Sequence, residues 1–221
     1  MRPLPSPAVG AGKLITIEGL DGAGKSTLAS SLVQALSGNR VSIELLREPG
    51  GVELSERIRG LVKDPALDVS ARAEALLYAA ARAQLVEQVV RPLLNAGVNV
   101  LLDRYVDSSL AYQGAARRLG VEQIRTINAF ATDGLEPDRT LLLRISPAAG
   151  RARQAERDEL PDRLEREDEE FFACIAAAYD ELAAAEPQRI RVLDASFTPA
   201  TVLADALDAL SDLLKPPARS S

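Results

Sequence analysis

The chain has 221 residues, of which 47% are hydrophobic and 26% charged, so it can bury one sizeable core. Its formal net charge of −6 argues against nucleic-acid binding, which normally requires a basic surface. The absence of histidine excludes histidine triads and histidine metal sites, and the single cysteine, Cys174, excludes an internal disulfide and favours a reducing compartment.

The chain begins with MRPLPSPAVGAGK, which lacks the apolar run of a signal peptide. We expect a flexible tail over residues 1–12 and another over residues 215–221, which read KPPARSS. No apolar run is long enough to cross a bilayer. The simplest expectation is a cytoplasmic protein with no membrane partner.

Between these tails, short runs rich in Val, Ile and Leu alternate with helical patterns. The runs lack polar alternation, which predicts buried parallel strands at residues 13–18, 41–46, 98–102, 140–145 and 190–193. Helices are predicted at residues 26–36, 55–63, 70–95, 121–131, 171–185 and 199–214. The alternation predicts a single α/β domain over residues 13–214, a three-layer sandwich with a parallel sheet between two helical layers.

The turn after the first predicted strand reads GLDGAGKS, which fits the pattern G-x-x-x-x-G-K-[ST] of phosphate-binding loops. Gly22 and Gly24 allow the backbone N–H groups to approach an anion, Lys25 can reach the β- and γ-phosphates, and the Ser26 hydroxyl can bind Mg²⁺. The alternative is a plain strand-to-helix turn. The expected ATP-binding residues are Gly19, Leu20, Asp21, Gly22, Ala23, Gly24, Lys25, Ser26 and Thr27.

A GTPase switch would also need an N-K-x-D motif, which this sequence lacks. The loop therefore leaves three possibilities: a kinase, an ATPase, or a module that senses nucleotides without catalysis.

Four further motifs narrow the choice: REPGG at residues 47–51, LLYAAARAQ at 76–84, DRYVDSSLAYQG at 103–114 and SPAAGRARQAERDELPDRLE at 146–165. With IEGLDGAGKST they resemble the bacterial thymidylate kinases over residues 13–210. The resemblance implies a P-loop kinase sheet of order 2-3-1-4-5, a homodimer, and Mg²⁺-dependent transfer of the γ-phosphoryl of ATP to dTMP for dTTP synthesis.

Asp103 and Arg104 follow the third predicted strand, at the sheet edge where α/β proteins bind ligands. A carboxylate there can hold Mg²⁺ through water, and an arginine can clamp a phosphate. A strand-end salt bridge is the alternative. The resemblance assigns Arg104 to the acceptor phosphate and Asp103 to the metal, beside Ser26. Arg47, after the second strand, is also expected near the acceptor phosphate, or in a salt bridge with Glu48 or a neighbour.

Tyr78 and Arg82 are four residues apart and share one helix face among alanines. On spacing alone a core tyrosine beside an exposed arginine is the favoured interpretation. The resemblance implies instead a thymine pocket, with the ring stacked on the base and the guanidinium donating to a carbonyl. Here tyrosine stands where phenylalanine is commoner in the family.

The resemblance also implies roles for four residues around the acceptor. Asp21 would meet the 3′-hydroxyl of dTMP, although aspartate is also an ordinary turn residue. Ser109 and Gln113 would face the base, and Tyr112 would crowd the 2′ position. For these three the alternative is a polar helix start after the strand.

The segment at about residues 148–167 is rich in arginines and acids, and its default interpretation is a solvated helix with ion pairs. Arg153 and Arg157, however, are like charges four residues apart, an unfavourable pairing unless an anion lies between them. The phosphate loop contains no arginine, and family members of that kind carry the catalytic arginine in a mobile lid. Arg153 and Arg157 are the leading catalytic candidates, with Lys25 and Arg104, and Arg163 comes third as an ATP contact.

The resemblance predicts a reaction without a general base, because the attacking phosphate oxygen is already ionised. Two alternatives remain open: a kinase for UMP, CMP or AMP, and a non-catalytic nucleotide-binding module. Lys25, Ser26 and Asp103 count against the second, because a sensor is expected to lack the loop lysine or the strand-end acid.

Overall fold

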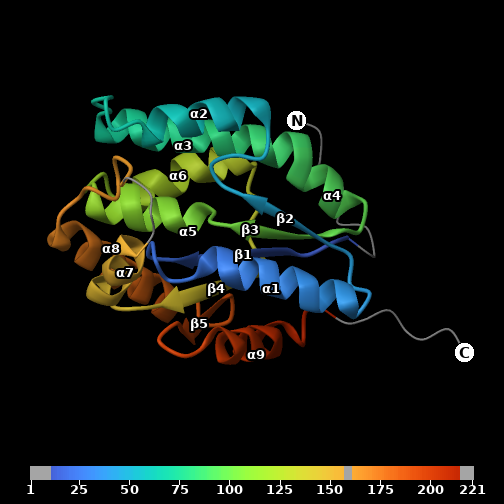
Figure 1. Cartoon of the computed structure of the whole chain (residues 1–221). Coiled ribbons are helices and arrows are strands. Elements are labelled where there is room, and N and C mark those ends of the chain that lie inside the picture. Colours follow the sequence, from blue (N-terminus) through green and yellow to red (C-terminus); the bar gives the residue numbers. More distant parts are fainter. Residues whose placement is uncertain (1–10, 157–160, 215–221) are drawn as a thin grey trace, which may run out of the picture.

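The computed structural model describes residues 11–156 and 161–214. Its centre is a five-stranded parallel sheet of order β2-β3-β1-β4-β5, which confirms the predicted architecture (Figure 1). The strands are β1 (Leu14–Gly19), β2 (Ile43–Arg47), β3 (Asn99–Asp103), β4 (Arg139–Arg144) and β5 (Ile190–Asp194). Because all strands are parallel, their carboxyl ends share one edge of the sheet, and the loop after β1 lies at that edge.

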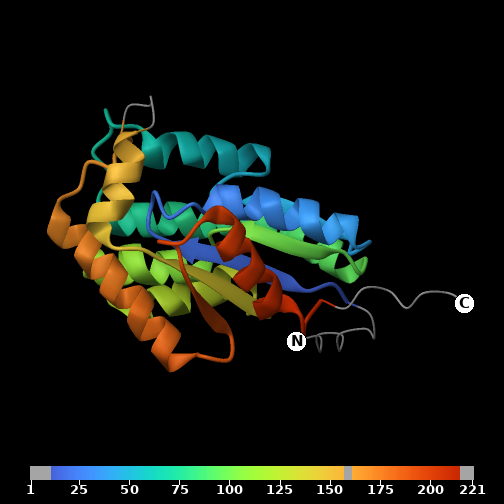
Figure 2. The same cartoon turned by 60° about the horizontal axis from the view of Figure 1, so that its bottom comes forward.

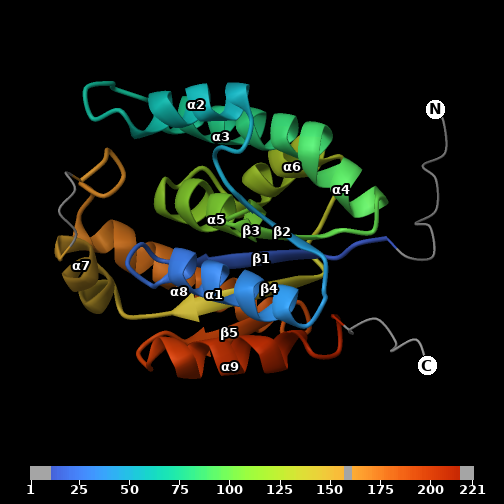
Figure 3. The ribbon, with the colours of Figure 1, turned by 45° about the vertical axis from the view of Figure 1, so that its right-hand side comes forward.

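Helices cover both faces of the sheet (Figure 3). One layer holds α1 (Lys25–Gly38) and α9 (Pro199–Leu210), which pack on each other and on the strands. The helices of the opposite layer are α3 (Ala71–Leu85), α4 (Arg91–Asn95), α5 (Val106–Ser109), α6 (Val121–Thr132) and α8 (Glu169–Ala185), joined by the π-helical segments η1 (Val86–Val90) and η2 (Leu110–Ala116). Helix α2 (Glu53–Lys63) packs on the outside of α3, and α7 (Pro147–Ala155) lies beside α8, the long orange helix of Figure 2.

The core forms because both sheet faces are apolar. Ile15, Ile17 and Leu141 are fully buried on one face of the sheet, and Val100 and Leu102 on the other. Strands without polar alternation bury both faces in this way. The apolar centre holds the strand ends rigidly, so the polar residues that follow them have fixed positions.

The helical segments differ from the predicted ones in several places, among them the α5–η2 segment after β3, which lies outside the predicted helices. The single helix predicted over residues 70–95 changes to π geometry at η1, just before Pro92, whose ring lacks an N–H and crowds the carbonyl four residues earlier. The last helix ends at Leu210, not at residue 214. Helix α7 ends at Ala155, whereas the default interpretation placed a solvated helix over the whole segment at about residues 148–167; Ser146 caps α7 and Pro147 opens it, a recognisable start signal.

Within the described ranges, no helix has both the length and the apolar character needed to cross a membrane.

Candidate active site

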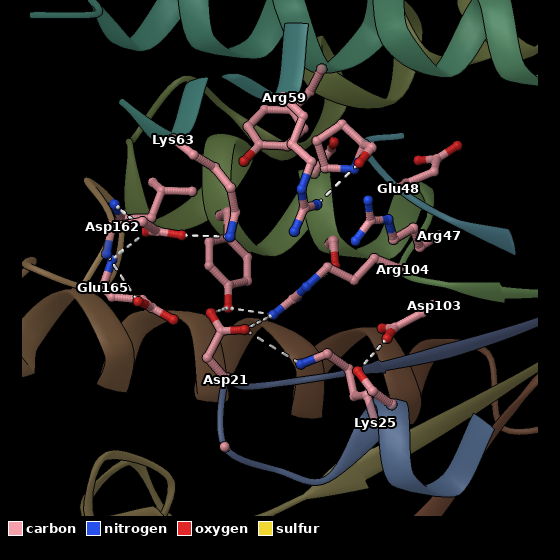
Figure 4. Close-up of a pocket in the computed structure, with 18 of the residues that line it drawn as sticks. Asp21, Lys25, Arg47, Glu48, Arg59, Lys63, Asp103, Arg104, Asp162 and Glu165 are labelled. Atoms are coloured by element: carbon pink, nitrogen blue, oxygen red, sulfur yellow. Dashed lines mark hydrogen bonds and ion pairs between the residues drawn. The ribbon is translucent and has the colours of Figure 1, made fainter. Parts of the chain in front are cut away.

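A cavity of about 340 Å³ opens at the carboxyl edge of the sheet (Figure 4). The loop after β1, the ends of β2 and β3, helices α2 and α3, the α5–η2 segment and residues 162–165 contribute its walls. The predicted residues that line it are Asp21, Gly22, Gly24, Lys25, Ser26, Thr27, Arg47, Tyr78, Arg82, Asp103, Arg104, Ser109, Tyr112 and Gln113. Gly19, Leu20 and Ala23 belong to the same loop but do not line the cavity.

The loop between β1 and α1 has the shape that its glycines predict. Gly24 has a φ of 93° and directly precedes α1, a conformation that glycine adopts without strain. Gly22 has a φ of 78°, and a Cβ on it would lie 2.1 Å from the carbonyl oxygen of Gly150 in α7. The loop backbone therefore turns tightly and touches α7.

Lys25 is buried and folds back along the loop. Its Nζ donates to the carbonyl oxygens of Gly19, at 3.1 Å, and Leu20, at 2.8 Å. Burial, together with the positive charge of Arg104, lowers the pKa of Lys25 to about 8. Its ammonium group lies 3.6 Å from Asp21, so a cation is held at the loop by neighbouring oxygens.

Ser26 and Asp103 meet across the sheet edge. The Ser26 hydroxyl donates to the Asp103 carboxylate over 2.9 Å. A hydroxyl and a carboxylate are hard oxygen ligands of the kind that Mg²⁺ prefers. Among the described residues no group of three or more Asp, Glu, His or Cys is placed to hold a metal, so these two oxygens would need phosphate oxygens and water to complete the coordination.

Arg104 directly follows the last residue of β3 and has a φ of 73°. Its side chain forms an ion pair with Asp21 and donates to the hydroxyls of Ser108, at 2.9 Å, and Tyr112, at 3.3 Å (Figure 4). The guanidinium also lies over the ring of Tyr112, 5.1 Å from its centroid. Three side chains thus fix the Arg104 guanidinium between the phosphate loop and the α5–η2 segment.

Asp21 faces two cations. Burial opposes its ionisation, but the charges of Arg104 and Lys25 outweigh this effect and hold the pKa of the Asp21 carboxyl well below its usual range. The Tyr112 hydroxyl donates to the same carboxylate over 3.2 Å. The carboxylate therefore stays ionised and ties the loop to Arg104.

Glu18 lies behind these residues, fully buried in β1. Its carboxylate accepts from the backbone N–H of Tyr105 at 2.8 Å, from the Ser108 hydroxyl at 2.5 Å and from the Tyr179 hydroxyl at 3.0 Å. Burial, and next the charge of Asp107, raise its pKa to about 7. Sequence reasoning missed Glu18, although a single acid inside the apolar run LITIEG was a usable signal.

Arg82 lines the cavity, and its side chain is only 2% exposed. The alternative of an exposed arginine is therefore wrong. It donates to Glu48 at 2.7 Å, to Ser109 at 3.0 Å, to the Tyr105 carbonyl at 2.9 Å and to Asn128. These bonds use four of the five guanidinium N–H groups. The fifth N–H group, on Nη2, has no partner among the described residues and can donate to a ligand.

The other predicted acceptor residues are also at the cavity. Tyr78 lines it from α3, and burial raises the pKa of its hydroxyl. Gln113 of η2 also lines the cavity and is buried, and its Nε2 donates to Glu74 over 2.8 Å. Arg47 lines the cavity and pairs with Glu56 at 3.2 Å, so an ion pair with a neighbour is present, and its contact with the acceptor phosphate stays a prediction.

Arg153 and Arg163, two of the three predicted lid arginines, do not line the cavity. Arg153 donates to the Ala195 carbonyl over 3.0 Å, after β5, and does not line the cavity. Arg157 lies outside the described residues. Arg163 donates to the Val62 carbonyl at 3.0 Å and to Glu74 at 2.5 Å, which fastens the segment to α2 and α3.

The lid segment reaches the cavity with other residues, which sequence reasoning missed. Asp162 and Glu165 line the cavity, and Asp162 pairs with Lys63 of α2 at 2.7 Å (Figure 4). Arg59 of α2 lines it too and donates to the Pro49 carbonyl over 3.0 Å. Arg59 and Lys63 are like charges four residues apart, so the spacing argument that selected lid arginines would also have found this pair.

Three comparisons with known proteins agree. The family model described as "Thymidylate kinase" matches residues 17–206. The thymidylate kinase of Deinococcus radiodurans is 48% identical over 185 residues, covering 84% of this chain and 89% of that one. The thymidylate kinase of Lactobacillus delbrueckii subsp. bulgaricus is 47% identical over 188 residues, with the same two coverages. The crystal structure of thymidylate kinase from Ehrlichia chaffeensis superposes with a TM-score of 0.74 at 26% identity, covering 90% of this chain and 99% of that one.

Proposed function

The chain belongs to the thymidylate kinase family, and from this premise we propose how its cavity arranges the two substrates. The enzyme is a nucleoside monophosphate kinase that transfers the γ-phosphoryl group of ATP to dTMP and forms ADP and dTDP. The observation that carries the proposed arrangement is that one cavity is lined both by the phosphate loop and by Tyr78, Arg82 and Gln113.

The donor side is the loop after β1. The backbone N–H groups around Gly22 and Gly24, with the ammonium of Lys25, bind the phosphates of ATP. Ser26 and Asp103 hold Mg²⁺, which neutralises phosphate charge when it is bound. The carbonyls that now hold the Lys25 ammonium fix its position near the transferred group.

The acceptor side is the rest of the cavity. Arg104 and Arg47 hold the dTMP phosphate in line with the donor, because both guanidiniums line the cavity next to the loop. Asp21 receives the 3′-hydroxyl, and the Tyr112 ring occupies the space that a ribose 2′-hydroxyl would need. The base-binding residues are Tyr78, which stacks on thymine, and Arg82, Ser109 and Gln113, which read its polar edge.

The segment over about residues 148–167 acts as a mobile lid. Arg153 and Arg157 neutralise charge on the transferred phosphoryl group when the lid closes, and Arg163 supports the ATP side. The support is indirect: the loop itself has no arginine, and closure would exclude water from the cavity. For Arg153 this requires release of the Ala195 carbonyl.

We also propose a cytoplasmic homodimer. Four large apolar side chains are exposed on α2, α3 and α6, three helices that lie next to one another: Leu54, Leu61, Leu76 and Phe130. Exposed apolar side chains on adjacent helices favour burial against a second copy of the chain. Light scattering on the purified protein measures the mass directly, and a monomer at micromolar concentration would contradict the proposal.

The substrate test is a coupled assay of ADP release with dTMP, UMP, CMP and AMP as acceptors. We expect the highest kcat/KM with dTMP. Lys25→Met is the background control, because it keeps the bulk of the side chain and removes its charge. Equal efficiency with UMP or AMP would contradict the proposed base pocket.

A further inference from the structure

One buried carboxylate outside the cavity wall connects three elements. Glu74, in the first turn of α3, is fully buried and does not line the cavity. It accepts from Gln113 of η2 at 2.8 Å, from Arg163 of the lid at 2.5 Å and from Arg117, just after η2, at 3.3 Å. The base-facing wall and the lid therefore share one anchor.

This contact determines which end of the Gln113 amide faces the cavity. An ionised carboxylate only accepts hydrogen bonds, so Gln113 must turn its NH₂ group toward Glu74. Its carbonyl oxygen is then the end left for a ligand. Gln113 is buried, so water cannot compensate the reversed orientation, which would place two acceptors against each other.

The amide orientation has a chemical consequence for base choice. A carbonyl oxygen accepts a hydrogen bond and so matches a base that presents an N–H group. Thymine carries a hydrogen on N3, whereas the N3 of cytosine is an acceptor. A fixed carbonyl favours thymine, while an amide free to rotate would suit either base.

We propose that Glu74 is a positioning residue: it fixes the Gln113 carbonyl toward the base and anchors the lid through Arg163, so one carboxylate serves both base choice and lid position. This inference rests on the proposed acceptor pocket. Arg117 reinforces the arrangement, because its guanidinium also pairs with Glu167, at 2.6 Å, and lies 4.6 Å from the ring centroid of Phe171.

A purely structural role is the competing explanation. Removing one partner from a buried ion pair destabilises a protein whatever its function. That role predicts a loss of thermal stability without a change in base preference. The ratio of kcat/KM for dTMP to kcat/KM for dCMP separates the two explanations, because global destabilisation affects both substrates equally.

The experiment compares Glu74→Gln and Glu74→Asp with the wild type on dTMP and dCMP. Glu74→Asp keeps a negative charge near the two arginines but shortens the side chain, which weakens the hydrogen bond to Gln113, so it guards against misfolding of the amide variant. We expect the dTMP to dCMP ratio to fall at least tenfold in both. Arg163→Met should keep the ratio and lower kcat with dTMP, because only the lid anchor is lost.

Asp107→Asn is the matched control. Asp107 is a buried carboxylate that accepts two hydrogen bonds from Arg189, at 2.7 and 2.9 Å, and it does not line the cavity. This variant should melt at a lower temperature with an unchanged ratio.

The outcomes separate the inference from the function beneath it. A wild type that does not phosphorylate dTMP would contradict the proposed function. If the wild type prefers dTMP and both Glu74 variants keep its ratio within twofold, or neither variant folds, the inference about Glu74 is wrong while the function stands.

Discussion

The acceptor wall, which contains Arg82 and Arg104, and helix α7 of the lid hold their arginines in different ways; Arg163, farther along the lid, is fastened to Glu74 and belongs with the fixed ones. Arg82 has four partners from separate parts of the chain and is almost fully buried, and Arg104 has three side-chain partners around its guanidinium. In the lid, Arg153 makes one hydrogen bond to a carbonyl, and Arg151 pairs with Glu169, whose side chain is 84% exposed. A guanidinium with many buried partners keeps a fixed direction, whereas one with a single contact can be redirected at small cost.

This contrast suggests a division of labour. Fixed arginines suit a substrate that must be oriented before the reaction, because preorganised groups lose little freedom on binding. Loosely held arginines suit a charge that develops only during transfer, when the lid is closed. Four measurements test the contrast.

The largest effect is expected in the lid. Arg153→Ala should lower kcat by about a thousandfold, since a positioned arginine supplies that much in related phosphoryl transfers. The affinity for dTMP should change little, because the lid serves the donor phosphates. Steady-state kinetics measures both constants. Arg166→Ala is the control, because among the described residues the Arg166 side chain has one partner, the Pro161 carbonyl.

The same series includes Arg157→Ala and Arg163→Ala. If no lid arginine lowers kcat by even tenfold, which is about 1.4 kcal/mol of barrier, the missing charge must come from Arg47, Arg104 or a partner subunit. The arginines of the lid would then keep fixed positions, as those of the acceptor wall do, and would take no part in the transfer.

The second effect concerns stability at the acceptor wall. Arg82→Met should lower the free energy of unfolding by about 3 kcal/mol, because it leaves Glu48 buried without its cation. Denaturant unfolding measures this. Arg57→Met removes a pair with Glu53 in which both side chains are more than 70% exposed, and should change stability by less than about 0.5 kcal/mol. Similar losses in the two variants would mean that Arg82 is not held as the structure indicates.

The third effect is a pH dependence behind the acceptor wall. Burial raises the pKa of Glu18 from 4.5 to about 7, so the folded protein binds this proton more tightly than the unfolded chain. The stabilising contribution is complete below about pH 4.5 and is lost as the pH rises through 7. Glu18→Gln cannot ionise, so its stability relative to the wild type should rise over that interval by on the order of 1–3 kcal/mol.

Chemical denaturation at several pH values gives this difference. A constant difference between variant and wild type from pH 4.5 to 7 would show that Glu18 titrates normally.

The smallest effect tests whether helix α7 packs against the phosphate loop. Alanine is about 1 kcal/mol more favourable than glycine inside a helix. Gly60 of α2 has open space around its Cβ position, so Gly60→Ala should gain up to about 1 kcal/mol. At Gly150 of α7 the Cβ would lie 2.8 Å from the Asp21 carbonyl oxygen, so Gly150→Ala should gain nothing. Equal gains in thermal unfolding would show that α7 is not seated there in solution.

Local patterns explain why the loop and the sheet were predictable. The strand runs, the glycines of the loop and the residues after β2 and β3 each depend on a few neighbouring positions, and parallel strands bring their ends to one edge. The meeting of Lys25, Ser26, Asp103 and Arg104 at one cavity follows from these rules, while their roles stay predictions.

Long-range contacts explain what was missed. The partners of Arg82 lie up to 46 positions away in sequence, so spacing on α3 alone favoured the wrong, exposed alternative. Glu74 has contacts as distant as 89 positions, on the lid. The π geometry of η2 adds a further obstacle, because it changes which side chains share a face from the pattern expected of an α-helix.

The placement of the aromatic residues gives the protein a built-in optical probe. The chain has no tryptophan and four tyrosines. Tyr78 and Tyr112 line the cavity, Tyr179 bonds to Ser108 of its wall, and the Tyr105 ring lies 5.3 Å from the Arg82 guanidinium. The tyrosine emission of the unlabelled protein therefore arises at the cavity or in residues next to it, so quenching by a stacked base can report nucleotide binding in a titration without any dye.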